Sequence, residues 1–214
     1  KTEVLKNYVE ECIEKAGNEA LNLVGKQGGE INPGFYKAYA GDKVGYLCYT
    51  NSYSSCYNKK PFLKEYIEKE INQYLSQRIN LCVSNLDKSL QSKGYSLQKG
   101  PLFLNAKINV YNVLINLDYP LTITKGSSQV KLNNFTKIIN IPLGRLIKVA
   151  EDIVDAEIKV PFGLFSDQAY MMLQNGEIQI EIHKTEKTEI YIINTRESNY
   201  KFKFAVQNYV VPFP

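Results

Sequence analysis

The chain has 214 residues, of which 44% are hydrophobic, and this is enough to build a packed core in one domain or in two small ones. Its 26 basic and 22 acidic side chains give a net charge of +4 and are scattered without a block of one sign. A nucleic-acid-binding protein usually gathers its Lys and Arg on one face, so this pattern argues against nucleic acid as a partner.

The first predicted element is a helix over Glu3–Val24. Apolar residues recur in it at spacings of three and four, which places them on one face of a helix. Gly25 ends the pattern. Because the pattern is already complete near the first residue, we expect the helix to continue upstream, towards a membrane anchor.

Residues 30–60 contain one Pro and three Gly as breakers and predict an irregular segment with one short strand, Gly45–Thr50. The stretch Tyr46–Tyr57, which overlaps this strand, is rich in tyrosine and in small polar residues. Pro61 suits the first position of a second long helix, which is predicted to run to about Ser92 with a regular apolar stripe.

From Leu102 onward the apolar period changes to two, which predicts strands. The phase of the pattern flips at Tyr111–Asn112, as in a tight hairpin. We expect Pro120 to kink or interrupt the second strand. The segment Gly126–Ser128 then turns the chain into another strand, which ends near Ile141. These strands predict an antiparallel meander.

The last part of the chain predicts two helices followed by three strands. A third helix is predicted over Leu143–Glu157 and a short one over Ser166–Leu173, which Ser166 is suited to cap. Three strands are predicted after them: Glu177–Ile182, Thr188–Ile193 and Tyr200–Val206. They predict a second meander.

Together these elements predict an α+β fold, in which two long amphipathic helices pack on antiparallel β-meanders, with further short helices. We expect residues 1–160 to hold the helix pair and the first meander. Residues 161–208 are expected to form the second meander within the same domain, and residues 209–214, which include two prolines, to form a linker.

The four cysteines indicate the environment of the protein. Cys12 and Cys82 lie on the apolar faces of the two long helices. Cys48 and Cys56 close the tyrosine-rich loop. Their spacings match no zinc-binding pattern, so we expect two disulfides and an oxidising compartment outside the cytoplasm. Of the three possible pairings, Cys12–Cys82 with Cys48–Cys56 is favoured, because each pair then joins similar environments.

The sequence offers little for catalysis or for metal binding. Its single histidine, His183, has no cysteine, carboxylate or nucleophile partner at a suitable spacing. The acidic residues of the predicted helices are interleaved with Lys, as on solvated helix faces. We therefore predict a non-enzymatic protein without catalytic residues, metal or cofactor.

The tyrosine-rich loop has the composition of a contact surface. The candidate contact residues are Tyr46, Tyr49, Tyr53 and Tyr57. Their rings offer apolar area at a low cost in conformational entropy, and a disulfide would hold the loop in one shape. A plain surface loop would explain the same residues, because the chain has 16 tyrosines in all.

Two further features bear on location. Asn134 begins the sequon Asn134-Phe135-Thr136 and is a candidate glycosylation site, in agreement with an extracellular protein. No stretch reaches the roughly 18 consecutive apolar residues that a membrane-spanning helix needs. We therefore expect any targeting or anchoring segment to lie upstream of Lys1.

Several segments resemble a family of uncharacterised archaeal surface proteins. The ectodomains of that family open on a motif similar to Tyr8–Lys15, followed by an element like Leu23–Gly29. Further similarities are Asp118–Ile123, Tyr191–Ile193 and Tyr200–Val206, so that the resemblance spans most of the chain.

The resemblance implies a disulfide-bonded, outward-facing domain behind a single N-terminal transmembrane helix with a type IV pilin-like signal. It transfers no catalytic residues, because the family has none established. We therefore expect the ectodomain of a membrane-anchored cell-surface protein that serves adhesion, a surface appendage or envelope architecture, with a protein or glycan as partner. The alternative is a secreted or anchored module that binds a glycan or a small ligand.

Overall fold

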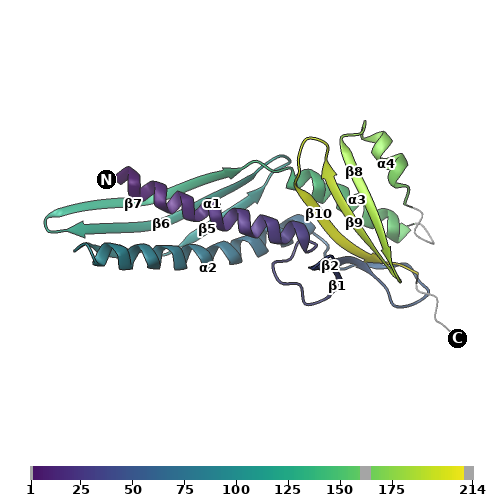
Figure 1. Ribbon diagram of the computed structural model, residues 1–214, viewed down its shortest axis with the longest axis horizontal. Coiled ribbons are helices and arrows are strands. Elements are labelled where there is room, and N and C mark those ends of the chain that lie inside the picture. Colours follow the sequence, from purple (N-terminus) through teal and green to yellow (C-terminus); the bar gives the residue numbers. More distant parts are fainter. Residues whose placement is uncertain (1, 160–164, 210–214) are drawn as a thin grey trace. The chain divides into compact units, whose positions relative to one another are not determined.

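The computed structural model describes residues 2–159 and 165–209, which form a mixed α+β structure with helices and two sheets (Figure 1). The chain divides into two compact units. Unit 1 comprises the residues up to Leu21 together with Ile71–Lys107 and Val113–Asn140. Unit 2 comprises Asn22–Glu70, Ile108–Asn112 and the described residues after Asn140. Of the linker expected over residues 209–214 only Tyr209 is described, and the boundary expected at residue 160 also lies outside the described residues.

Unit 1 contains most of two helices, α1 (Thr2–Lys26) and α2 (Leu63–Gln91), and a four-stranded sheet. Its strands are β4 (Ser96–Lys99), β5 (Phe103–Ile108), β6 (Val113–Lys125) and β7 (Ser128–Ile139). The long strand β6 pairs with β7 in antiparallel register from end to end (Figure 1). It also neighbours β4 and β5.

The core of unit 1 follows directly from the period-two pattern of β6. Every second residue of this strand is buried: Val113, Ile115, Leu117, Tyr119, Leu121 and Ile123. Helix α1 lies close on this face, because a Cβ added at Gly17 would be 2.7 Å from Cδ1 of Ile139 and 3.0 Å from Cδ1 of Ile115. Glycine at this position therefore sets how closely the helix approaches the sheet.

Two details of the predicted meander are present in β5–β7. At the expected hairpin the backbone N–H of Asn109 donates to the carbonyl of Asn112 at 2.8 Å. Pro120 lies within β6, and the pairing with β7 shifts register between Asp118 and Leu121. Since proline has no N–H to donate, an irregularity is the expected way for a long strand to contain it.

Unit 2 is built on a six-stranded sheet with two further helices, α3 (Leu143–Lys159) and α4 (Asp167–Leu173). The strands are β1 (Tyr36–Tyr39), β2 (Asp42–Tyr49), β3 (Tyr57–Asn58), β8 (Ile178–Thr185), β9 (Thr188–Thr195) and β10 (Lys201–Gln207). Their order is β1-β2-β10-β9-β8, with β3 beside β2. Ser166 caps α4 as predicted, since its Oγ accepts from the N–H of Ala169.

The second meander, β8-β9-β10, is antiparallel. However, β10 also pairs with β2 in parallel, which corrects the expectation of purely antiparallel sheets. Helix α2 begins at Leu63, so Pro61 lies before the helix and the prediction that it occupies the first helical position was wrong.

The two faces of the unit 2 sheet have different coverings. Tyr191 and Phe204 lie on the face under α3, with their rings stacked at 5.2 Å, and the Tyr191 hydroxyl donates to Oε1 of Glu157 in α3 at 2.8 Å. Because successive strand residues point to opposite sides, their neighbours Ile190 and Ala205 lie on the other face, in a separate cluster with Val44.

A helix that crosses a lipid bilayer must be both long enough and apolar enough. Among the described residues, no helix combines the two properties to the extent that a membrane crossing needs.

Candidate contact surface

The two disulfides confirm the favoured pairing. Cys12–Cys82 connects α1 with α2 across 70 residues, and Cys48–Cys56 connects β2 with the residue before β3 across 8 residues. All four cysteines are thus paired.

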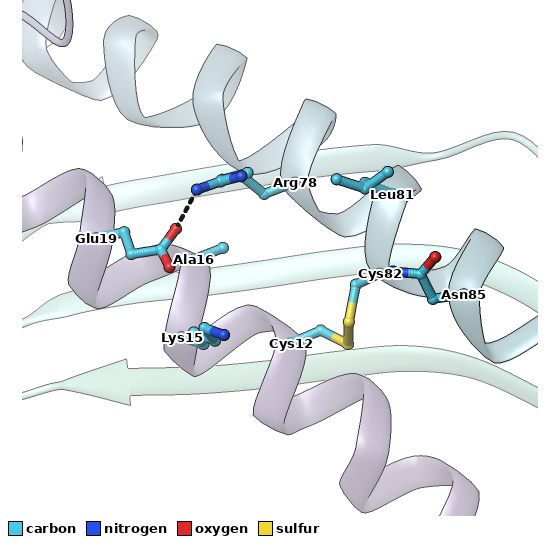
Figure 2. Close-up of a pocket in the computed structure, with 8 residues that line it drawn as sticks. All are labelled: Cys12, Lys15, Ala16, Glu19, Arg78, Leu81, Cys82 and Asn85. Atoms are coloured by element: carbon cyan, nitrogen blue, oxygen red, sulfur yellow. Dashed lines mark hydrogen bonds and ion pairs between the residues drawn. A yellow bond between two sulfur atoms is a disulfide. The ribbon is translucent and has the colours of Figure 1, made fainter.

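The first disulfide lines a hollow between the two helices of unit 1 (Figure 2). On its rim, Arg78 and Glu19 form an ion pair at 2.9 Å, and the ring of Tyr74 lies beside the guanidinium group. The hollow holds about 200 Å³, which is less than the roughly 300 Å³ of the smaller ligand sites. We therefore assign this region a structural role, that of holding the helices together.

The second disulfide fixes the tyrosine-rich loop at its base. Cys48 and Cys56 are both buried. Directly beside them, Tyr49 of β2 pairs with Tyr57 of β3. The N–H of Cys56 also donates to Oδ1 of Asn208 at 2.7 Å. The loop between the cysteines is therefore held at both ends.

The four predicted contact tyrosines have different surroundings. Tyr53 and Tyr57 are exposed, with 57% and 56% of their surface accessible, and Tyr49 is half-buried. Tyr46 is 7% exposed and belongs to the core, which corrects its assignment to the contact surface. The reason is that β2 is buried on both of its faces along most of its length, so alternation does not bring Tyr46 to the surface.

The structure brings three of these tyrosines together with two residues that the sequence analysis did not consider. The ring of Phe35 lies 4.9 Å from that of Tyr46 and 4.7 Å from that of Tyr49. The Nζ atom of Lys59 lies 5.7 Å from the ring centre of Phe35 and 4.9 Å from that of Tyr57. We call Phe35, Tyr49, Tyr57 and Lys59 the aromatic cluster, which rests on the buried ring of Tyr46.

The outer part of the aromatic cluster is accessible. Phe35 is 46% exposed, Tyr57 is exposed to a similar degree, and Lys59 is exposed between them. An ammonium group over ring faces is attracted by the negative charge of the π systems, and this contact holds the lysine in place while it can still meet an acidic group. The cluster therefore offers apolar rings around one positive charge.

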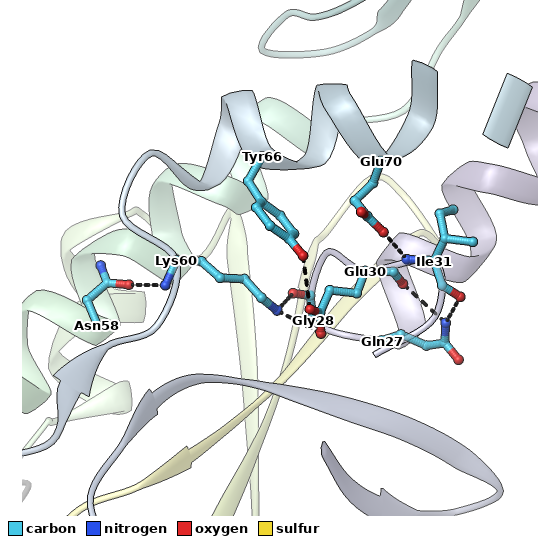
Figure 3. A network of polar contacts seen from close by, with 8 residues as sticks. All are labelled: Gln27, Gly28, Glu30, Ile31, Asn58, Lys60, Tyr66 and Glu70. Atoms are coloured by element: carbon cyan, nitrogen blue, oxygen red, sulfur yellow. Dashed lines mark hydrogen bonds and ion pairs between the residues drawn. The ribbon is translucent and has the colours of Figure 1, made fainter. Parts of the chain in front are cut away.

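A buried polar network holds the neighbouring backbone (Figure 3). The Nζ atom of Lys60 lies 3.1 Å from Oε2 of Glu30 and donates to the carbonyl of Gly28 at 2.9 Å. The hydroxyl of Tyr66 donates to the other oxygen of Glu30 at 3.0 Å. Glu70 accepts from the N–H of Ile31 at 2.8 Å. These contacts tie β3 and the start of α2 to residues 28–31.

Burial dominates the electrostatics of this network. The side chain of Lys60 is 7% exposed and that of Glu30 is 17% exposed. Desolvation lowers the pKa of Lys60 below its ordinary value of 10.5, and the negative charge of Glu30 opposes this effect only in part. Since Lys60 follows Lys59 directly, the buried network also fixes where the exposed lysine emerges.

The remaining predicted site residues lie elsewhere. Asn134 is exposed in β7, and the hydroxyl of Thr136 in the same sequon donates to Oδ1 of Asn116 at 3.0 Å. His183 lies in β8 with Nε2 at 3.5 Å from Glu181. In residues 2–159 and 165–209, no three His, Cys, Asp or Glu side chains gather in a way that could hold a metal ion.

Comparison with known proteins identifies no relative. No protein-family model, no curated protein and no solved structure matches this chain.

Proposed function

We propose that this chain is the non-enzymatic ectodomain of a membrane-anchored cell-surface protein that binds a partner protein through the aromatic cluster. The observation that carries the proposal is the pair of exposed rings, Phe35 and Tyr57, on either side of Lys59. Tyrosine and other aromatic residues are enriched at binding hot spots, because each buries a large apolar area at low entropic cost.

The location outside the cytoplasm is supported by the disulfides, which persist in oxidising compartments. The resemblance to archaeal surface proteins supports an anchor upstream and a role in adhesion, a surface appendage or envelope architecture. In this proposal α1 and α2 act as amphipathic helices that pack on the meander of unit 1, and α1 continues towards the anchor.

The contact surface is tested by replacing Tyr57 of the aromatic cluster together with Tyr53, the other exposed tyrosine of the loop. The variant Y53S/Y57S should bind the envelope fraction of the producing cells at least about 10-fold more weakly than the wild type, because truncated hot-spot tyrosines cost 2 kcal/mol or more. Its melting temperature should stay nearly unchanged, since both side chains are largely in solvent. Pull-down titration and thermal melting measure the two effects.

Tyr111 provides the matched control, because it is 64% exposed and lies outside the aromatic cluster. The variant Y111S should bind like the wild type. Equal weakening by Y111S and Y53S/Y57S, or unchanged binding of the latter, would contradict the proposal.

The proposed location makes Asn134 a glycosylation site. Peptide mapping by mass spectrometry of protein isolated from its natural source should find a glycan on the peptide that contains Asn134. The variant T136A should lose that glycan, because the sequon requires Ser or Thr at its third position. An unmodified Asn134 peptide at full occupancy would contradict glycosylation at this site.

A further inference from the structure

The sheet of unit 2 curls until its two outer strands approach each other. In strand order β1 and β8 lie at opposite ends of the path. Nevertheless the ring of Tyr39 in β1 lies 5.6 Å from that of His183 in β8. Lys37 in β1 also forms a hydrogen-bonded ion pair, at 3.0 Å, with Glu186 in the turn after β8. The sheet thus resembles a small, incompletely closed barrel.

The inside of this curled sheet is the face that α3 does not cover. It is filled by a compact cluster of buried side chains: Val44, Tyr46, Ile190, Ile192 and Ala205. Tyr39 and Tyr49 pack against the cluster from the sides. These side chains leave a cavity of about 460 Å³ beside the turn that joins β8 to β9. The mouths of β-barrels are common places for small-molecule sites, and the volume lies in their usual range.

The wall of this cavity includes three polar side chains that are almost completely buried. Tyr46, Thr188 and Gln207 are 7%, 3% and 8% exposed, respectively. They come from three different strands, β2, β9 and β10. None of them carries a charge, so this part of the wall is polar but neutral.

Their hydrogen bonds form a chain with one possible direction. The amide Nε2 of Gln207 donates to the carbonyl of Thr50 at 3.0 Å, so its Oε1, which can only accept, faces Thr188. The hydroxyl of Thr188 therefore donates its one proton to Oε1 of Gln207, at 3.1 Å. It follows that Tyr46 donates to Thr188 at 2.8 Å and that the phenol oxygen of Tyr46 is left as an acceptor.

The charges around the cavity belong to its rim. Lys37 is paired with Glu186, whose side chain is 83% exposed, and Lys187 lies beside them. The buried part of the wall is polar but neutral, and the rim carries charges of both signs. The cavity therefore has no buried charge that could balance the charge of an ionic ligand. It is suited to an uncharged ligand that donates a hydrogen bond to Tyr46.

We propose that this cavity binds a neutral sugar, one hydroxyl of which donates to the phenol oxygen of Tyr46. A sugar combines hydroxyl donors with apolar C–H surface, which can pack on the tyrosine ring and on the aliphatic part of Lys37. The proposal does not depend on the aromatic cluster being a partner surface. It gives the glycan-binding alternative raised by the sequence a defined site.

Saturation-transfer NMR with glucose, galactose, mannose and N-acetylglucosamine tests the proposal. At least one of them should bind with a dissociation constant of about 1 mM, in keeping with the small size of the ligand. The variant Y46F should weaken that binding at least about 10-fold. It should fold normally, because Thr188 keeps its own acceptor and no buried donor loses its partner.

Two controls separate this site from the contact surface. The variant Y53S/Y57S should bind sugar like the wild type, and Y46F should bind the envelope fraction like the wild type. A measurement on the wild type alone, the shift of the Gln207 side-chain amide resonances on adding sugar, does not depend on any variant. The proposal is overturned if none of the four sugars binds at about 50 mM, if Y46F binds equally well, or if gluconate or glucosamine binds more tightly.

Discussion

The variant C12A/C82A should lose about 4 kcal/mol of its free energy of unfolding. The bond closes a loop of 70 residues, and the entropy that a cross-link removes from the unfolded chain grows with the logarithm of loop length. Alanine is the suitable replacement, because Cys12 is buried and a serine hydroxyl there would add a desolvation cost of its own.

The matched control is C48A/C56A, which opens a loop of 8 residues. The same relation gives about 2.5 kcal/mol for this loop. Guanidinium unfolding, followed by circular dichroism under non-reducing conditions, measures both values. An equal or smaller loss for C12A/C82A would show that the long-range bond does not act mainly through the unfolded chain.

The variant E30L should lose about 3 to 5 kcal/mol of its free energy of unfolding. This change leaves the ammonium group of Lys60 buried without its counter-charge, and an uncompensated buried charge costs this much. The double variant E30L/K60M, which removes both charges, should lose less free energy of unfolding than E30L, because no buried charge of the pair then remains. Urea unfolding of both variants and the wild type measures the difference.

The pH dependence of E30L provides an independent check. Burial already lowers the pKa of Lys60 in the folded wild type, and the loss of Glu30 removes the main opposing effect. Between the lowered pKa and 10.5 the unfolded chain binds more protons than the folded one, so stability rises with pH in this window. E30L should therefore regain part of the lost free energy of unfolding when the pH is raised from 7 to 9.5. A loss that is the same at both pH values would argue against a charged, buried Lys60 as its cause.

The long helices and the main strands were predictable, because each depends on a repeat within one segment. The alternation from Val113 to Ile123 encodes one buried and one exposed face of β6, and the sequence shows it without reference to any other strand. The cysteine pairing was predictable for a related reason: each cysteine shares its kind of surroundings with its partner.

The features that the sequence analysis missed depend on contacts between distant segments. The short strands β1, β3 and β4 have too few residues to show a period, and the parallel pairing of β2 with β10 joins opposite ends of the chain. The sequence assigns Tyr46 to the surface because it belongs to the tyrosine-rich stretch that ends at Tyr57, whereas its burial is set by β9 and β10. Lys59 follows Tyr57 by two residues in the sequence, which could have suggested it, but Phe35 becomes its neighbour only after folding.

The position of β10 has a consequence for how the protein is made. In the described sheet of unit 2, β10 is the strand that joins β1, β2 and β3 to β8 and β9. During synthesis it emerges last among these strands, so until then the edges of β2 and β9 remain open to other chains. Unit 2 therefore cannot complete its sheet while the ribosome or a secretion channel still holds residues 201–207. A chain that crosses a membrane would complete this sheet only after residues 201–207 have arrived on the other side.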